Sequence, residues 1–297
     1  MRLNNLLKSA SLKQKVVVAI AGADNRESID FVIEALTLKL AKFLLVGDEY
    51  VIRKYLNENS IPDDEALQIV HAISKEDAAH LAVRAVDSNQ ATILMKGNIP
   101  SRLLLKTVLN NAYGLKSTSG LSHVAVFEIP DYQQLLIVTD AAMNIAPSLM
   151  EKKYIIENAV KVANSIGIVN PNVIALAAVE EVNPSMQATI DAAALTLMNR
   201  RGQIKNCQIE GPLALDNAIS VISARQKGID SEIAGKADII VVPNIEVGNV
   251  LYKSLVYFGK AKVGAFIVGA KTPIVFTSRA DSLEAKLYSL ALSICSL

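Results

Sequence analysis

The chain has 297 residues, of which 51% are hydrophobic and 20% charged, and its 30 Lys and Arg are balanced by 29 Asp and Glu. This length suits two domains of about 150 residues each, both able to bury a core. With no basic block, no tryptophan and only 5% aromatic residues, the composition argues against nucleic acid or a charged membrane surface as a partner. Cys207 and Cys295 lie far apart, outside any CxxC pattern, and only three histidines occur. We therefore expect reduced thiols and no metal site.

An apolar run near the N-terminus, VVVAIAGA at 16–23, follows several basic residues and so resembles a signal peptide. However, the run is short, begins with three valines and is followed by DNRES, a good helix start. We therefore expect a buried first strand. No stretch approaches the roughly 20 uninterrupted apolar residues of a membrane span, and we expect a cytoplasmic protein.

In the first 110 residues, short apolar runs alternate with helical patterns. The runs lack strict polar alternation, which is typical of parallel strands covered on both faces. The predicted strands are 16–22, 42–47, 67–72 and 91–97, and the predicted helices are 27–41, 48–57, 75–87 and 100–110. Strands that alternate with helices predict βαβ units and a doubly wound α/β sheet.

The pattern changes after Gly114, where two apolar runs, 123–129 and 135–141, are joined by PDYQQ and predict a hairpin. Alternation then resumes. The further predicted strands are 172–178, 207–210, 236–243, 262–269 and 272–278, and the further predicted helices are 147–165, 184–199, 247–258 and a last one with Leu283, Leu287, Leu290 and Ile294 on its apolar face. Because the last strand and helix are expected to return to the first domain, we predict domains of 1–120 plus 271–297 and of 121–270.

The stretch TPIVFTSRADSLEAKL places Ser278 and Arg279 where a predicted strand ends and a helix begins. In open α/β sheets ligands bind beyond the carboxyl ends of the strands, and helix N-termini favour anions. An arginine adds a planar fork that pairs with phosphate oxygens. The alternative is a helix cap by Ser278 or Ser282 with a solvated arginine.

Two other stretches contain candidate binding residues. In GPLALDNAIS, Asp216 stands at a helix start, either as a ligand-binding residue or as an ordinary first-turn residue. Asn249 and Lys253 are four apart and share a helix face, so they could grip a polar substrate or form a surface pair. The sequence contains no GxxxxGK[ST], no GxGxxG after the first strand, no HExxH and no GxSxG, which leaves Walker, Rossmann, zincin and hydrolase sites without support.

Taken together, several segments resemble the phosphate acetyl/butyryltransferase family, and within it the phosphate butyryltransferase branch. The matching segments are ILMKG, LSHVAVFEIP, LLIVTDAAMNIAP, ALAAVEEVNPSM, GPLALDNAIS, AGKADIIVVPNIEVGNVLYKS and TSRADS, in order over about residues 90–295. The resemblance implies two α/β/α domains with mostly parallel sheets and an interdomain cleft, like those of the isocitrate and isopropylmalate dehydrogenases. It implies transfer of a short-chain acyl group between CoA and phosphate without a cofactor or metal. The expected partners are acyl-CoA, phosphate, acyl phosphate and further copies of the chain, in a homodimer or higher homo-oligomer.

By motif matching, Ser278 and Arg279 fall on the Ser-Arg pair at the family's active site. The arginine would bind the phosphoryl group, and the serine would donate a hydrogen bond at the acyl centre. Arg102 lies roughly where the acetyl branch has a further substrate-binding arginine, although the spacing differs. The remaining predicted substrate-binding residues are Asp140, Asn144, Asp216, Asn249 and Lys253.

One position departs from the acetyl branch, which has an aspartate seven positions after the serine, proposed as the base for CoA. Here that position is Ala285, and the nearby acids Asp281 and Glu284 are only possible bases. A thiol of pKa ~8.5 is already a few per cent ionised at pH 7, so full ionisation costs about 2 kcal/mol. Loss of a donor to a developing oxyanion costs ~10²–10³ in rate. We therefore expect Ser278 and Arg279 to matter more than the base.

Three other functions stay open. A phosphate acetyltransferase would share the fold and differ in acyl group. A metal-dependent decarboxylating dehydrogenase would need clustered aspartates, but 270–297 contains only Asp281. A CoA or acyl-phosphate sensor without turnover would account for Ala285.

Overall fold

The computed structural model describes residues 2–13, 15–61, 65–115, 120–278 and 280–297. The chain divides into two compact units. The N-terminal unit consists of Leu3–Thr118 with Gly264–Leu297, and the middle unit consists of Met1–Arg2 with Ser119–Val263.

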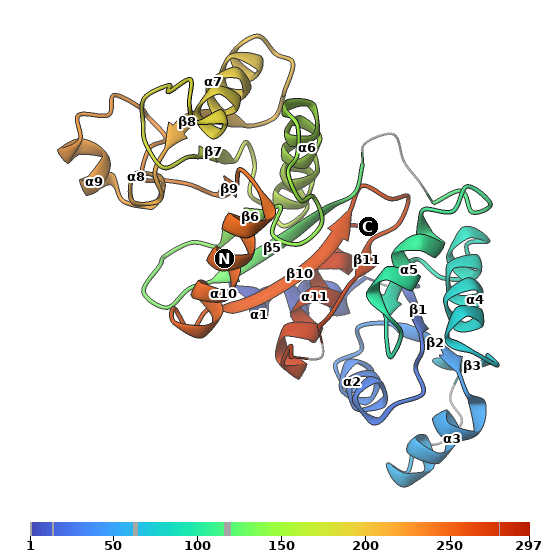
Figure 1. Ribbon diagram of the computed structural model, residues 1–297. Helices are drawn as coiled ribbons and strands as arrows, with labels where there is room; N and C mark the ends of the chain where they lie inside the picture. The colour runs from blue at the N-terminus through green and yellow to red at the C-terminus, as the bar shows by residue number, and fades with distance from the viewer. Residues whose placement is uncertain (1, 14, 62–64, 116–119, 279) are drawn as a thin grey trace. The chain divides into compact units, whose positions relative to one another are not determined.

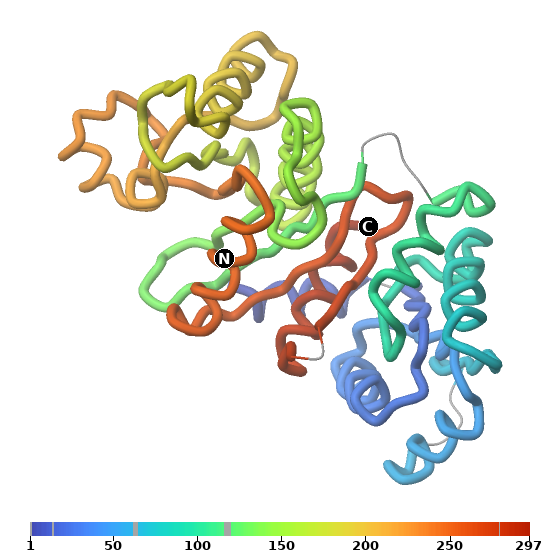
Figure 2. The backbone as a smooth tube through the Cα atoms, viewed as in Figure 1, coloured from blue at the N-terminus to red at the C-terminus, as the bar shows by residue number. Residues whose placement is uncertain are grey.

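The sheet of the N-terminal unit has the strand order β3-β2-β1-β4-β11-β10. Its strands are β1 (Val17–Ala21), β2 (Lys42–Gly47), β3 (Leu67–His71), β4 (Ile93–Lys96), β10 (Lys262–Val268) and β11 (Ile274–Val275). The strands from β3 to β11 pair in parallel, and β10 runs antiparallel to β11. Ile274 pairs with Leu94 of β4, so the C-terminal stretch, drawn in red in Figure 2, joins the sheet built by the first strands of the chain.

The helices of the N-terminal unit, labelled in Figure 1, are α1 (Leu3–Ser11), α2 (Arg26–Thr37), α3 (Glu49–Glu58), α4 (Lys75–Asp87), α5 (Ser101–Val108) and α11 (Leu283–Cys295). Side-chain caps start several of them, for example Asn25 on α2 and Ser282 on α11. Helix α11 is buried almost throughout, from Lys286 to Cys295. It packs against α1, where the Tyr288 hydroxyl lies 2.5 Å from Asn4 Oδ1.

The middle unit has the strand order β5-β6-β9-β7-β8. Its strands are β5 (Ser122–Glu128), β6 (Leu136–Thr139), β7 (Asn172–Leu176), β8 (Gln208–Leu213) and β9 (Ile239–Val241), and its helices are α6 (Leu149–Ser165), α7 (Gln187–Arg200), α8 (Leu215–Ile219), α9 (Val221–Gln226) and α10 (Ile245–Tyr257). β5 and β6 are antiparallel, whereas the β6–β9, β9–β7 and β7–β8 pairs are parallel.

The expected mixed α/β class with mostly parallel strands is confirmed, as is the predicted hairpin, which forms the β5–β6 pair. The last strand and helix belong to the N-terminal unit, which resumes at Gly264. The division into domains and the cleft between them stay predictions.

Helix α1 was not among the predicted elements. Its Leu3, Leu6 and Ala10 are buried, and their spacing is that of a helix face. The last predicted strand is much shorter than 272–278, because regular pairing covers only Ile274–Val275. No helix in the described part of the chain is long and apolar enough to cross a membrane.

Candidate active site

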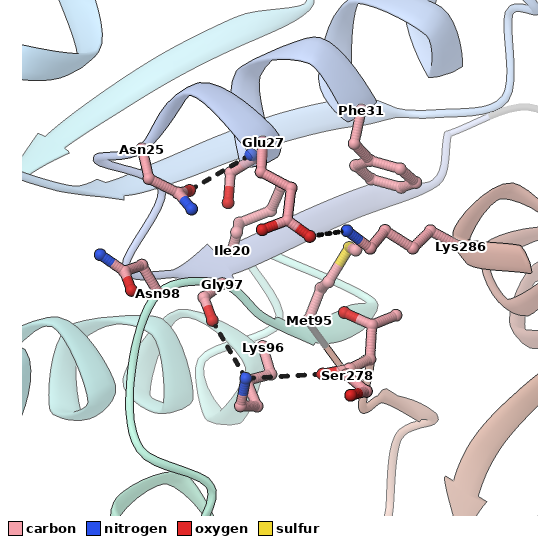
Figure 3. A pocket seen from close by; sticks show the side chains of 12 residues that line it. Ile20, Asn25, Glu27, Phe31, Met95, Lys96, Gly97, Asn98, Ser278 and Lys286 are labelled. Carbon is pink, nitrogen blue, oxygen red and sulfur yellow. Dashed lines mark hydrogen bonds and ion pairs between the residues drawn. The ribbon is translucent and has the colours of Figure 1, made fainter. Parts of the chain in front are cut away.

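A pocket opens in the N-terminal unit at the carboxyl ends of β1, β4 and β11, beside the N-terminus of α2 (Figure 3). Its lining comes from residues far apart in sequence: Ile20, Asn25, Glu27, Ser28, Phe31, Met95, Lys96, Gly97, Asn98, Thr277, Ser278 and Lys286. Ile20, Phe31 and Met95 are buried and make the apolar part of the wall. This is the edge of a parallel sheet at which ligands bind in open α/β folds.

Two glycines let the loops after β1 and β4 approach each other at the pocket. A Cβ atom on Gly97 would lie 2.2 Å from the carbonyl oxygen of Gly22, which no side chain tolerates. Gly22 has φ +77°, in the left-handed region that glycine adopts readily. The Asn98 N–H donates to the Gly22 carbonyl at 2.6 Å and holds the loops together.

Helix α2 begins at the pocket. The Asn25 side chain accepts a hydrogen bond from the Ser28 N–H at 3.2 Å, and Glu27 lies in the first turn. The N–H groups and the dipole of such a helix start give the pocket positive potential along this wall.

Ser278 lies just beyond β11, is exposed and lines the pocket. Its N–H donates to Asp281 Oδ2 at 2.7 Å, and its Oγ accepts from the Ala280 N–H at 3.2 Å. Ser282, not Ser278, is the residue that caps α11. The serine hydroxyl proton can therefore point at a ligand. Arg279, the other predicted catalytic residue, lies outside the described residues.

Lys96 supplies a cation at the end of β4. Its Nζ donates to the carbonyls of Gly97 at 3.3 Å and Thr277 at 3.5 Å, and it lies 5.9 Å from the centre of the Phe276 ring. Lys96 is not among the residues predicted from the sequence, although ILMKG is one of the matching segments. A lysine followed by a glycine at the carboxyl end of a parallel strand is the signal that could have found it.

Lys286 and Glu27 form an ion pair in the pocket wall between α11 and α2 (Figure 3). The Lys286 side chain is 7% exposed and that of Glu27 is 44% exposed. Neither residue was predicted from the sequence, where they stand 259 positions apart.

The two possible bases are occupied elsewhere. Asp281 accepts the Ser278 N–H in a tight turn, and Glu284 Oε1 accepts from the Tyr288 hydroxyl at 2.8 Å. Neither is among the described residues that line the pocket. Ala285 lies in the first turn of α11, where its N–H donates to the Ser282 cap at 3.1 Å.

The structure does not bring Arg102 to this pocket. It lies in the first turn of α5 with an exposed side chain, and it is not among the described lining residues. Its predicted contact with substrate stays a prediction.

Asp140 and Asn144, both in the middle unit, bind each other. Asp140 is buried, and its Oδ1 accepts from the N–H groups of Ala142 at 2.9 Å and Met143 at 2.8 Å. Its Oδ2 accepts from Asn144 Nδ2 at 2.6 Å, and that amide also donates to the Leu121 carbonyl. These bonds close the turn after β6.

The other predicted residues of the middle unit are more exposed. Asp216 lies 3.2 Å from Lys227 Nζ. The pKa of Lys227 is raised, first by its hydrogen bond to Glu180 and next by the one to Asp216. Asn249 and Lys253 both project from α10 and are exposed. Among the described residues, no group of three or more His, Cys, Asp or Glu could hold a metal ion.

A family model described as "Phosphate acetyl/butaryl transferase" matches residues 64–294. The "Probable phosphate butyryltransferase" of Bacillus subtilis (strain 168) is 55% identical over 99% of this chain and 98% of its own length. The "Phosphate acetyltransferase" of Thermotoga maritima is 43% identical over 99% of both chains. A solved structure of a branched-chain phosphotransacylase from Enterococcus faecalis V583 superimposes with a TM-score of 0.83, at 38% identity, covering 95% of this chain and 99% of the other.

The chain therefore belongs to the phosphate acetyl/butyryltransferase family and is an acyltransferase. The 55% identity to a probable phosphate butyryltransferase agrees with the branch expected from the sequence. The matched residues 64–294 contain Lys96 and Ser278.

Proposed function

We propose that this enzyme moves a short-chain acyl group, butyryl above all, between CoA and inorganic phosphate by direct transfer in a ternary complex. The observation that carries the proposal is the pocket of the N-terminal unit. In it, Ser278 and Lys96 lie at adjoining strand ends beside the start of α2. Such a site suits a phosphoryl group next to an acyl carbonyl.

The phosphoryl group would bind between Lys96, the N-terminus of α2 and Arg279. A lysine acts as a point charge for phosphate, and an arginine adds two parallel hydrogen bonds. Arg279 follows Ser278 directly in the chain, which supports this assignment. These groups would hold the charge of the leaving phosphate.

Ser278 would stabilise the acyl centre. Because its Oγ already accepts the Ala280 N–H, its own proton remains to donate to the carbonyl oxygen as negative charge develops there. Acyl transfer changes no oxidation state, so the reaction as proposed uses CoA and phosphate as substrates and needs no redox cofactor.

Direct transfer is also supported by the two cysteines. Cys207 and Cys295 are buried, and burial raises the pKa of both thiols, that of Cys207 to about 11. A thiol with a raised pKa is a poor nucleophile at neutral pH, so neither cysteine is suited to carry the acyl group.

For the CoA moiety, we propose Asn249 and Lys253 on the exposed face of α10, with Asp216 and Arg102 as further contacts. We propose Asp140 and Asn144 as substrate-binding residues as well, held in place by the hydrogen bond that they make with each other. A cytoplasmic location and a homodimer or higher homo-oligomer are part of the same proposal.

Phosphate acetyltransferase activity is the second candidate, favoured by the 43% identity to the Thermotoga maritima enzyme. The ratio of kcat/KM for butyryl-CoA and acetyl-CoA separates the two, since each methylene in an apolar pocket is worth about 1–3 kcal/mol. A ratio well above one supports butyryl transfer.

The test of the proposed site is Arg279→Ala, followed by CoA-dependent thioester formation from acyl phosphate. We expect a rate loss of ~10²–10³ and a weaker dependence on phosphate in the reverse direction. Arg53→Ala is the control, because Arg53 pairs with Glu49 within α3. Near-normal activity with unchanged phosphate dependence would contradict the assignment.

A further inference from the structure

Position 285 of α11, where the acetyl branch has an aspartate as the proposed base, is an alanine in this chain. The pocket nevertheless contains a carboxylate, that of Glu27. We propose that Glu27 of α2 is the acceptor of the CoA proton and that Lys286 is the residue that positions it. The proposal rests on the function proposed above.

The position of the pair supports this role. Lys286 directly follows Ala285 in the first turns of α11, and its ammonium contacts the Glu27 carboxylate. A carboxylate is thus brought next to this part of α11 from a different helix. Figure 3 shows Glu27 reaching from α2 toward Lys286, with Lys96 and Ser278 across the pocket.

Exposure decides which member of the pair can meet a substrate. Lys286 is buried and its side chain is 7% exposed, whereas the Glu27 side chain is 44% exposed. Since a carboxylate has two oxygens that accept hydrogen bonds, Glu27 can bind Lys286 and still take a proton from a thiol. The other nearby acids, Asp281 and Glu284, are not among the described residues that line the pocket.

Among the described residues that line the pocket, the charged ones besides Glu27 are Lys286 of α11 and Lys96 of β4. On α2 itself, the neighbouring Arg26 pairs with Glu58 of α3 at 2.8 Å and lies over the Tyr55 ring. Arg26 is therefore directed at α3.

The proton balance of the reaction calls for such a group. In the direction of thioester formation, the sulfur of CoA attacks the acyl carbon, the C–S bond forms and the bond from carbon to phosphate oxygen breaks. The thiol loses one proton, and the leaving phosphate gains one to become hydrogen phosphate. Glu27 takes the proton from sulfur and returns it to a phosphate oxygen, and in reverse it protonates the departing thiolate.

The test is the pH profile of thioester formation by Glu27→Gln with saturating acyl phosphate. We expect a loss of about 10²-fold at pH 7, the lower end of the effect of general acid–base groups. The loss should shrink toward pH 9, because CoA with a pKa of ~8.5 then ionises by itself. Glu27→Ala should regain activity on addition of formate, whereas Ser278→Ala should lose activity at every pH and gain nothing from formate.

Glu49→Gln is the matched control, since Glu49 also lies in the first turn of a helix and pairs with an arginine. The double variant Glu27→Gln/Lys286→Met keeps the net charge. If it unfolds at the wild-type temperature and shows the same pH-dependent loss, the loss belongs to chemistry and not to folding.

A wild-type pH profile for Glu27→Gln, or a pH-dependent loss for Glu284→Gln in its place, overturns the role of Glu27 while leaving the proposed function standing. Failure of the unaltered enzyme to form any thioester overturns the proposed function and this role with it.

Discussion

In the N-terminal unit, Lys96, Ser278 and Glu27 line an open pocket, whereas in the middle unit Lys152 and Asp191 are both buried and bind each other at 2.5 Å. Both groups of polar residues belong to units in which helices accompany mostly parallel strands. The pocket residues and the buried pair differ in their exposure and in their hydrogen-bond partners. Lys152 and Asp191 are held within the protein, where Asp191 also accepts from Gln187 Nε2, whereas the side chains of Ser278 and Glu27 are exposed at the pocket. Polar residues in this fold are therefore expected to divide into those that act on substrate and those that hold the unit together.

The largest expected effect is on the stability of the middle unit. Lys152→Met leaves Asp191 buried with only Gln187, whose Nε2 donates to it at 2.8 Å. Breaking a buried ion pair costs about 3–5 kcal/mol, so the urea midpoint should fall strongly. Lys153→Met is the matched control, since its partially exposed i,i+4 pair with Glu157 is worth about 0.3–0.5 kcal/mol. An equal fall of the urea midpoint in both variants would contradict a special contribution of the buried pair to stability.

The next effect is on activity and comes from the pocket. Lys96→Met should lower kcat/KM by ~10²–10³ as a lost donor to developing charge, with the free energy of unfolding changed far less than by Lys152→Met. Steady-state kinetics and urea unfolding on the same samples measure both quantities. Lys106→Met, on the exposed side of α5, is the control and should keep full activity. Retained activity in Lys96→Met would remove this lysine from the site.

A smaller effect is expected from α10. Asn249→Ala and Lys253→Ala should each raise KM for CoA by up to about tenfold and leave kcat unchanged. This is the expected result when a residue binds the substrate equally well in the ground state and in the transition state. The Lys253 effect should fade at high salt, since exposed charges are screened. Lys236→Ala, whose ammonium donates to the Glu232 carbonyl, serves as the control. Unchanged KM at low salt would exclude these residues from CoA binding.

The smallest effect concerns the buried thiols. Burial, and next the charge of Glu157, raises the pKa of Cys207 to about 11, so roughly one thiol in 10³ is ionised at pH 8. Native protein should resist iodoacetamide, whereas protein in guanidinium should react at both cysteines. Because the folded pKa is above the ordinary value of 9.0, the free energy of unfolding should fall as pH rises from about 9 to 11. Rapid alkylation of the native protein, with loss of activity, would favour an acyl-cysteine route.

Much of the fold could be predicted because parallel strands appear as short apolar runs. The strand 42–47 and the helix 75–87 were predicted with the bounds that the structure has. Helix α1 was missed because its burial comes from contact with α11 at the other end of the chain. The predicted strand 272–278 is longer than β11 because the apolar run continues beyond the two paired residues.

Residues of the candidate site could be predicted only where a short sequence pattern indicates them. Ser278 stands at a strand-to-helix junction, which left a plain helix cap open as the alternative, and the matching segment TSRADS then assigned it to the site. The Glu27–Lys286 pair joins the pocket through helix packing, which no local pattern contains. Lys96 does carry a local signal, a lysine followed by a glycine at the end of a strand, which the prediction did not use. The hydrogen bond between Asp140 and Asn144 was not predicted from the sequence, and their contact with substrate stays a prediction.

The most direct measurement is phosphate-dependent release of CoA thiol from butyryl-CoA by the unaltered protein, beside Ser278→Ala. We predict release that requires phosphate, yields butyryl phosphate in equal amount, proceeds faster than with acetyl-CoA and falls at least ~10²-fold in the variant. Release that ignores phosphate, or that is equal in Ser278→Ala, would contradict the assignment of acyl transfer to this pocket.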